Sequence, residues 1–141
     1  MASARVHHHV NSSELKILLA SPSGAVAKDL LRRGKKVESK AKQNLSRNPR
    51  RIDTGTLRSS IKTELLSLGG KPVVRVGTNL FYAIYVHDGT GIYGPKGTPI
   101  KPKQAKMLSW KAKTGKRVYA KQVKGMRPNP FLTDAVDAAK D

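Results

Sequence analysis

Histidine is the first residue type in this chain that could do chemistry. His7–His9 form a run near the start of the sequence, and His87 is followed by Asp88. Adjacent histidines in an extended segment point to alternate faces and do not easily converge on one metal ion, and a purification-tag remnant is an alternative origin. One imidazole beside one carboxylate, with no serine-elbow motif and no second acid nearby, makes a weak acid–base pair. We favour a turn-capping role for Asp88 before Gly89.

A glycine-rich segment, residues 89–97, superficially resembles a phosphate-binding loop. It reads Gly-Thr-Gly-Ile-Tyr-Gly-Pro-Lys-Gly. A P-loop needs G-x-x-x-x-G-K-[ST] between a strand and a helix, whereas here a proline intervenes and no helix is expected to follow. We therefore interpret the segment as a flexible loop whose glycines permit its turns.

Two aromatic residues, Trp110 and Tyr119, flank the turn signal Thr114-Gly115 and are expected to face each other across a β-hairpin. Exposed aromatic rings of this kind can stack on bases, as they do in proteins that bind single-stranded nucleic acids. A cross-strand pair that helps to fill a core is the alternative, and it is the one that we favour.

Acidic residues are scarce in the sequence. There are nine Asp and Glu residues, spread singly along the chain, and no cysteine. The sequence therefore contains no carboxylate pair for acid–base catalysis, no thiolate ligand or nucleophile, and no plausible metal cluster. We predict a protein that is not an enzyme and that has no catalytic residues, no cofactor and no metal site.

Positive charge dominates the composition, with 28 Lys and Arg residues and a formal net charge of +19. The charge is uneven, because no acid occurs from Gly89 to Thr133 while eleven Lys or Arg residues lie between Lys96 and Arg127. Such a field attracts polyanions, either DNA or an acidic protein neighbour. A solvated loop without a partner is the alternative.

The length of 141 residues suits one domain, and no run approaches the roughly 18 apolar residues of a membrane span. Helical spacing predicts a long amphipathic helix that starts at Ser21-Pro22 and ends before Asn48-Pro49. Gly34 interrupts its apolar face. The apolar residues on that face are Val26, Leu30, Val37, Ala41 and Leu45. A shorter helix is expected before it, from a capping-box pair of Asn11 and Glu14.

Strands are expected after the long helix. Alternation at residues 61–65 and 73–76, around a Gly-Gly-Lys-Pro turn, predicts an antiparallel pair, and residues 107–111 and 117–123 predict a second hairpin. The spacing of apolar residues does not decide whether residues 81–86 form a helix or a strand. Residues 131–139 are expected to form a short amphipathic helix at the end of the chain. This order of elements indicates an α+β domain.

A turn at Asp53-Thr54-Gly55 is expected to form the structural corner between the long helix and the first strand. We predict that the Asp53 carboxylate accepts hydrogen bonds from the backbone amides of Gly55 or Thr56, as a helix cap does. Gly55 is expected to need a backbone conformation that a Cβ atom would hinder.

Several segments in order resemble the neck or tail-completion (head–tail joining) proteins of lambda-like long-tailed bacteriophages, especially those from phages of actinobacteria. The resemblance rests on the long basic helix, on Asp53-Thr-Gly-Thr-Leu-Arg-Ser-Ser-Ile61, on Val76-Gly-Thr followed by Tyr82 to Gly94, and on Pro128-Asn-Pro-Phe-Leu132. It covers residues 15–139.

The resemblance implies a single domain over residues 1–141, with an N-terminal arm (residues 1–20), a long N-terminal helix packed on a small antiparallel sheet, a short C-terminal helix and an extended basic loop (residues 89–106). It implies a structural virion protein, made in the host cytoplasm, that forms a homo-oligomeric ring, commonly of six copies, at the head–tail junction. The partners implied are other neck proteins and the tail tube or tail terminator. Tail completion, tail terminator and head-closure stopper all remain open.

The extended loop is the candidate partner-contacting site. We expect Lys96, Lys101, Lys103 and Lys106 to supply its charge and Ile92 and Tyr93 its apolar anchor. The loop has too few apolar side chains to form a core of its own. We therefore expect it to become ordered only against a neighbouring subunit, an adjacent ring or DNA in the channel. The alternative function, from another class, is that of a small basic nucleic-acid-binding protein.

Overall fold

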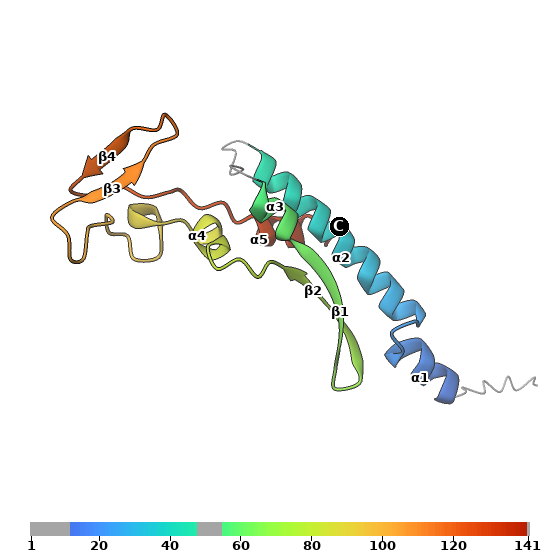
Figure 1. Ribbon diagram of the computed structural model, residues 1–141. Helices are drawn as coiled ribbons and strands as arrows, with labels where there is room; N and C mark the ends of the chain where they lie inside the picture. Colours follow the sequence, from blue (N-terminus) through green and yellow to red (C-terminus); the bar gives the residue numbers. More distant parts are fainter. Residues whose placement is uncertain (1–11, 48–54, 141) are drawn as a thin grey trace, which may run out of the picture.

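The chain folds into an elongated body with a slender lobe at one end. The computed structural model describes residues 12–47 and 55–140 (Figure 1). The elements in chain order are α1 (Ser12–Ala20), α2 (Ala25–Ser46), α3 (Thr56–Ser60), β1 (Lys62–Leu68), β2 (Lys71–Gly77), α4 (Ala83–Asp88), the 3₁₀ helix η1 (Gly91–Tyr93), β3 (Leu108–Lys111), β4 (Arg117–Ala120) and α5 (Phe131–Asp137).

Helix α2 is the spine of the body. Its 22 residues make it about 33 Å long at 1.5 Å per residue, and every other element of the body lies against it or near one of its ends. The long helix was predicted, but its start was placed wrongly at Ser21-Pro22. The N-cap is Gly24, and the Ser21 hydroxyl instead accepts a hydrogen bond from the amide of Ser23 in the turn between α1 and α2.

The hairpin of β1 and β2 packs with one face on α2. The two strands are antiparallel, with Thr63 opposite Val76 and Leu65 opposite Val74, and the glycines of the two-residue turn both have positive φ. Gly34, which seemed in the sequence to interrupt the apolar face of α2, is buried where the helix meets the hairpin. Its missing side chain lets the helix backbone approach Thr63 and Val74 closely.

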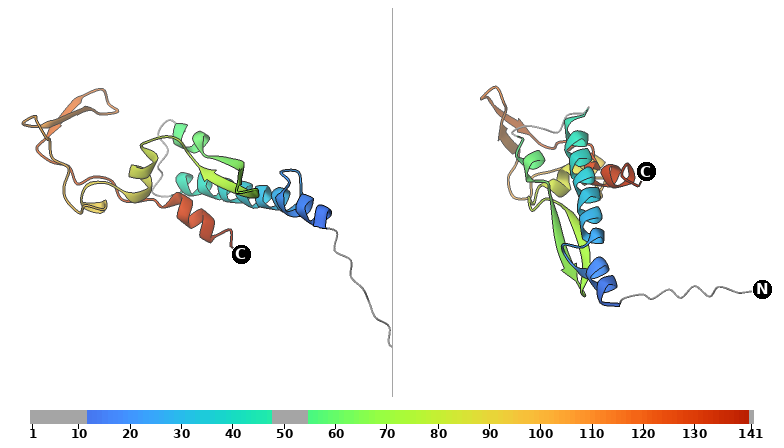
Figure 2. Two further views of the ribbon diagram at one scale, coloured as in Figure 1. Left: turned by 90° about the horizontal axis from the view of Figure 1, so that it is seen from below. Right: turned by 90° about the vertical axis from the view of Figure 1, so that its right-hand side faces the viewer.

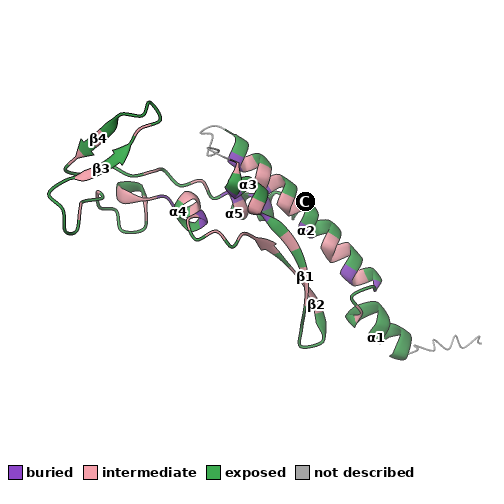
Figure 3. Cartoon of the chain, in the orientation of Figure 1, coloured by how far each residue is buried: buried purple, intermediate pink, exposed green. Residues whose placement is uncertain are grey.

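The hydrophobic core sits at the C-terminal end of α2, where α3, α4 and α5 converge (Figure 3). Phe131, Leu45 and Ile61 are its largest fully buried side chains. Ala41, Leu57, Ala83 and Ala135 complete the buried cluster. Packing against the C-terminal end of α2 thus holds together short elements that are far apart in the sequence.

The predicted fold class is confirmed: the chain is α+β, with a long helix on a small antiparallel sheet and a short C-terminal helix. The segment left open, residues 81–86, lies largely within helix α4. The second hairpin forms as β3 and β4, but the expected pairing of its aromatic residues is wrong. Trp110 is opposite Val118 and Tyr119 is opposite Ser109, so the two rings point to opposite faces.

A basic lobe, residues 89–127, projects from the body beyond α4 and carries the β3–β4 hairpin at its far end (Figure 2). The chain runs outward through η1, turns at the hairpin and returns antiparallel to its outward course, with a single β-bridge between Ile100 and Val123. Among residues 90–127, all of which are described, none is buried. The lobe therefore has no hydrophobic core of its own.

Some sequence-based expectations fall outside the described residues. They concern the histidines of His7–His9, the cap at Asn11 and the carboxylate of Asp53. Within the described part of the chain, no helix is both long enough and apolar enough to cross a bilayer.

Candidate partner-binding surfaces

The corner between the long helix and the first strand is described from Gly55 onward. Gly55 is the N-cap of α3 and has a φ of 82°, in the left-handed region that favours glycine. The hydroxyl of Ser60, the last residue of α3, lies 2.6 Å from that of Thr78, which directly follows β2, so this contact joins the chain entering β1 to the chain leaving β2. The cap predicted for Asp53 stays a prediction.

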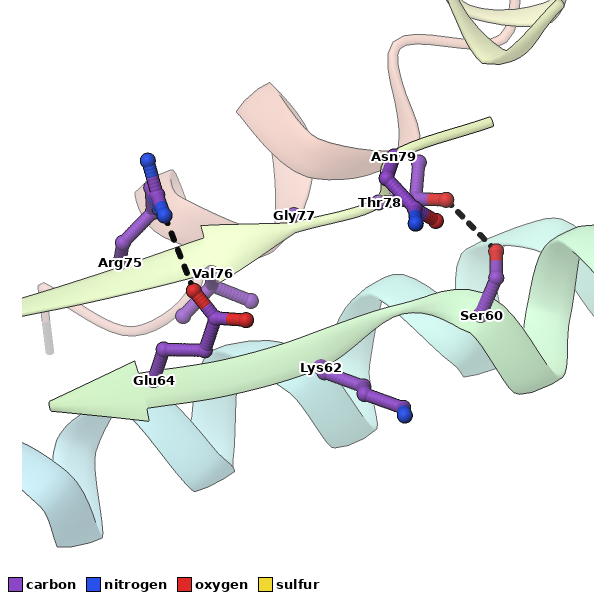
Figure 4. Close-up of a pocket in the computed structure, with 8 residues that line it drawn as sticks. All are labelled: Ser60, Lys62, Glu64, Arg75, Val76, Gly77, Thr78 and Asn79. Carbon is purple, nitrogen blue, oxygen red and sulfur yellow. Dashed lines mark hydrogen bonds and ion pairs between the residues drawn. The ribbon is translucent and has the colours of Figure 1, made fainter. Parts of the chain in front are cut away.

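A hollow of about 520 Å³ lies on the face of the hairpin turned away from α2 (Figure 4). The side chains facing it include Glu64, which pairs with Arg75 at 3.0 Å, and Ser60 with its partner Thr78. Each of these four polar groups therefore already has a partner within the hollow: Glu64 with Arg75, and Ser60 with Thr78. The hollow thus resembles a shallow contact surface more than a site for chemistry.

His87 ties α4 to α5. Its Nδ1 lies 2.7 Å from the Asp88 carboxylate, its Nε2 lies 3.2 Å from the Thr133 hydroxyl, and its ring packs edge-on against Phe131. The order hydroxyl, imidazole, carboxylate superficially resembles a catalytic triad, but here the half-buried His87 joins the ends of two helices, and the Asp88 and Thr133 side chains are exposed. Asp88 engages the imidazole, whereas the sequence had favoured a cap on the Gly89 turn.

The root of the basic lobe is a close crossing of two backbone segments. The amides of Thr90 and Ile92 donate to the carbonyls of Met126 and Lys124, both at 2.8 Å. A Cβ atom on Gly91 would collide with the Lys124 carbonyl, and one on Gly125 would collide with that of Thr90. The sequence predicts glycines that only permit turns and a loop without structure of its own; the structure differs, because the glycines allow hydrogen bonding across the root.

The candidate contact residues line the outward course of the lobe and do not converge on one point. Tyr93 lies under the guanidinium of Arg127, 5.4 Å from the ring centroid, so its ring already has a partner within the lobe. Ile92 is part-exposed beside it. The four lysines named in the sequence are exposed further along this course: Lys96, Lys101, Lys103 and Lys106.

The tip of the lobe, the hairpin of residues 108–120, is amphipathic. One face carries Leu108, Trp110, Val118 and Ala120, and the other carries Ser109, Lys111, Arg117 and Tyr119. Lys111 and Arg117 are directly opposite, an arrangement of like charges that destabilises an isolated hairpin. Sequence reasoning named the outward loop and missed this tip, although its cluster of four cations in residues 111–117 was visible.

Two further surfaces, both apolar, lie at opposite ends of the body (Figure 1). The first, the α1 face, presents Leu15, Leu18 and Leu19, all exposed; the spacing i, i+3, i+4 puts them on one side of the helix, and Ile17 is exposed on the opposite side. The second, the α4 face, presents Phe81, Ile84 and Tyr85, with Phe81 83% exposed. Ile84 and Tyr85 are in the first turn of α4, and Phe81 lies in the turn just before the helix, with its ring edge-on to Tyr82. Apolar clusters of this kind on a small domain are typical of protein interfaces.

Two ionised clusters on α2 stabilise the spine. Hydrogen bonds from Arg32 and then Arg33 lower the pKa of Asp29 on the exposed face. The Lys42 ammonium, at 2.5 Å, and then the Thr63 hydroxyl lower the pKa of Glu38 below its ordinary value of 4.5. Because Thr63 is on β1, Glu38 also links the helix to the hairpin. Both clusters belong to the fold and leave the lobe's charge uncompensated.

The fold and its surfaces define a small α+β protein with extensive contact surfaces: two apolar helix faces and a basic lobe. Residues 23–89 match the family model described as "Bacteriophage HK97-gp10, putative tail-component". That segment, which begins just before α2 and ends at the root of the lobe, is similar to a family of phage tail components, and the match supports the resemblance seen in the sequence over these residues. No curated protein and no solved structure matches the chain.

Proposed function

We propose that this protein is a non-enzymatic structural subunit of a phage virion, and that its copies form a ring at the head–tail junction that joins tail to head. The single observation that carries the proposal is the pair of apolar helix faces at opposite ends of the body. The family match supports a place in the tail, and the resemblance implies six copies.

Two different apolar faces on one chain fit a head-to-tail contact. If the α1 face of one copy covers the α4 face of the next, each copy uses both faces, and the contact repeats until the ring closes. Leucine side chains on the α1 face, and Phe81, Ile84 and Tyr85 on the α4 face, provide the apolar area that stable interfaces bury. The ring interface is thus heterologous.

Two matched variants test this contact. The first replaces Leu15 and Leu18 on the α1 face by serine, and the second replaces Phe81 and Ile84 on the α4 face by serine. Each variant keeps one intact face, so we expect each to be monomeric alone and the two to form a heterodimer when mixed, measured by light scattering after gel filtration. Leu68→Ser, on an exposed leucine at the end of β1, is the control and should assemble as the unchanged chain does.

The mixing experiment distinguishes the symmetry of the contact. Dimerisation of either variant alone would mean that one face pairs with itself, and full assembly of both would mean that neither face is used. A complementation assay of head–tail joining then tests whether the protein acts at the head–tail junction. A protein that assembles but does not restore joining has a different role in the virion.

We further propose that the whole chain acts as one domain, that Asp53 and Gly55 form its structural corner, and that the outward course of the lobe contacts a neighbouring component through its lysines and Ile92 and Tyr93. Trimming residues 92–106 to a short Gly-Ser linker should abolish joining. A small basic nucleic-acid-binding protein remains the other candidate because the lobe's charge favours it, but that function does not account for the two apolar faces.

A further inference from the structure

We infer that the tip of the basic lobe binds double-stranded DNA by lying in a groove and contacting phosphates without regard to base sequence. The inference deepens the proposed function, since it names the partner of the lobe, and it rests on that function only for where the protein meets DNA. Charge, composition and shape of the lobe support it independently.

Charge complementarity points to a polyanion. The lobe carries eleven of the chain's Lys and Arg residues and no Asp or Glu, so it offers no carboxylate of its own to offset them. Four of the eleven fall within residues 111–117, at and around the turn of the β3–β4 hairpin. Another copy of this chain, with its net charge of +19, is electrostatically the wrong partner for this tip.

The kind of cation distinguishes DNA from an acidic protein. Nine of the eleven cations are lysines and two are arginines. Protein interfaces are depleted in lysine and enriched in arginine. Base-specific readout of guanine also relies largely on arginine's bidentate fork. A lysine-rich surface instead suits point contacts with a regular row of phosphates, which carry no sequence information.

The shape of the tip fits a duplex. It is a two-stranded ribbon that projects from the body, and no other helix or strand of the described residues packs extensively on it. Strands in such a ribbon are about 4.8 Å apart, and a major groove about 12 Å wide admits a two-stranded β-ribbon. Trp110 and Tyr119 are 43% and 58% exposed, one on each face, and can contact the groove walls.

The test measures binding of the full-length protein to labelled duplexes of two unrelated sequences, about 21 base pairs long, by fluorescence anisotropy at several salt concentrations. The tip variant changes Lys111, Lys113, Lys116 and Arg117 to glutamine. The control variant removes the same charge from the body, by changing Lys28, Lys35, Lys36 and Lys71 to glutamine. Each variant therefore has the same net charge.

We expect the unchanged protein to bind both duplexes equally and to lose affinity steeply with salt. Each phosphate contact contributes about 0.9 to the slope of log affinity against log salt, so the tip variant should lose about three to four from that slope and the control less than about one. Trp110 is the chain's single tryptophan, and its emission should change on adding DNA. That signal places the contact at the tip.

Three outcomes would overturn the inference: equal losses in the tip and control variants, no binding at about 50 mM salt, or a polyglutamate peptide that changes Trp110 emission and competes with DNA at equal charge. The third outcome would make an acidic protein the partner. If the fourfold variant misfolds, as seen by circular dichroism, the pair Lys113→Gln and Lys116→Gln in the turn should still reduce the slope by about two. Light scattering on the same samples separates failure of DNA binding from failure of ring assembly.

Discussion

Replacing Gly34 by alanine is the sharpest test of how α2 and the hairpin fit together. A Cβ at this position would lie 2.7 Å from Cγ2 of Thr63 and closer still to Cγ1 of Val74. Both neighbours are β-branched and stiff at χ1, and both are on the paired strands β1 and β2. The hairpin as a whole must therefore move away from the helix to make room.

Two opposing effects set the magnitude. Inserting a methyl group into a packed interface costs about 1–3 kcal/mol, whereas alanine in place of glycine gains about 1 kcal/mol in a helix interior. The steric cost is expected at the upper end, because two stiff side chains are affected. We expect a net destabilisation of about 1–2 kcal/mol, or a fall in Tm of roughly 3–7 °C for a chain of this size.

Thermal and urea unfolding followed by circular dichroism measure the effect. Ser39→Ala, at an exposed position of the same helix, reports on the helix-propensity gain alone. Val74→Ala removes the nearer of the two atoms that a new Cβ would meet and leaves the Thr63 methyl, so Gly34→Ala should cost less in that background than in the unchanged chain. A Gly34→Ala variant as stable as Ser39→Ala would refute close packing at this point.

Three further results follow from the structure. Because Lys42 and Thr63 lower the pKa of Glu38, the carboxylate stabilises the fold above its ordinary pKa of 4.5 and loses that effect as the pH falls through the lowered pKa. Glu38→Gln should therefore cost about 1 kcal/mol at pH 7, measured by urea unfolding, and the difference should vanish in acid. Gly125→Ala should disrupt the lobe's root and change Trp110 emission while the melting of the body, followed by helix content, stays within error. The purified protein should leave plasmid DNA uncut with Mg²⁺ or Mn²⁺; cleavage that His87→Ala abolishes would contradict a purely structural role.

Periodicity in the sequence was enough to predict the elements of the body. Val37, Ala41 and Leu45 lie on the packed side of α2, and Gly69-Gly70 forms the turn of the first hairpin, because local spacing and turn chemistry decide both. The aromatic pairing failed because a shift of one residue in register moves a side chain to the other face, and the sequence alone does not fix that register.

Close backbone contacts were the other feature that the sequence concealed. Gly34, Gly91 and Gly125 look like interruptions or turn formers, yet their role arises from a second segment that crosses them. Helix–hairpin packing brings Thr63 and Val74 to Gly34, and the returning chain brings Lys124 to Gly91. Such contacts are long-range, so composition near each glycine carries no sign of them.

The two proposed contacts respond to salt in opposite directions. Copies that each carry +19 repel one another, and that repulsion reaches about 10 Å at 0.1 M salt but only about 3 Å at 1 M. Assembly through the apolar α1 and α4 faces should therefore strengthen as salt is added, while DNA binding by the lobe weakens. At low salt, DNA should promote assembly, because it offsets the charge that keeps the copies apart. Light scattering across a salt series, with and without duplex, measures both, and assembly that weakens with salt in the absence of DNA would mean that ion pairs hold the ring.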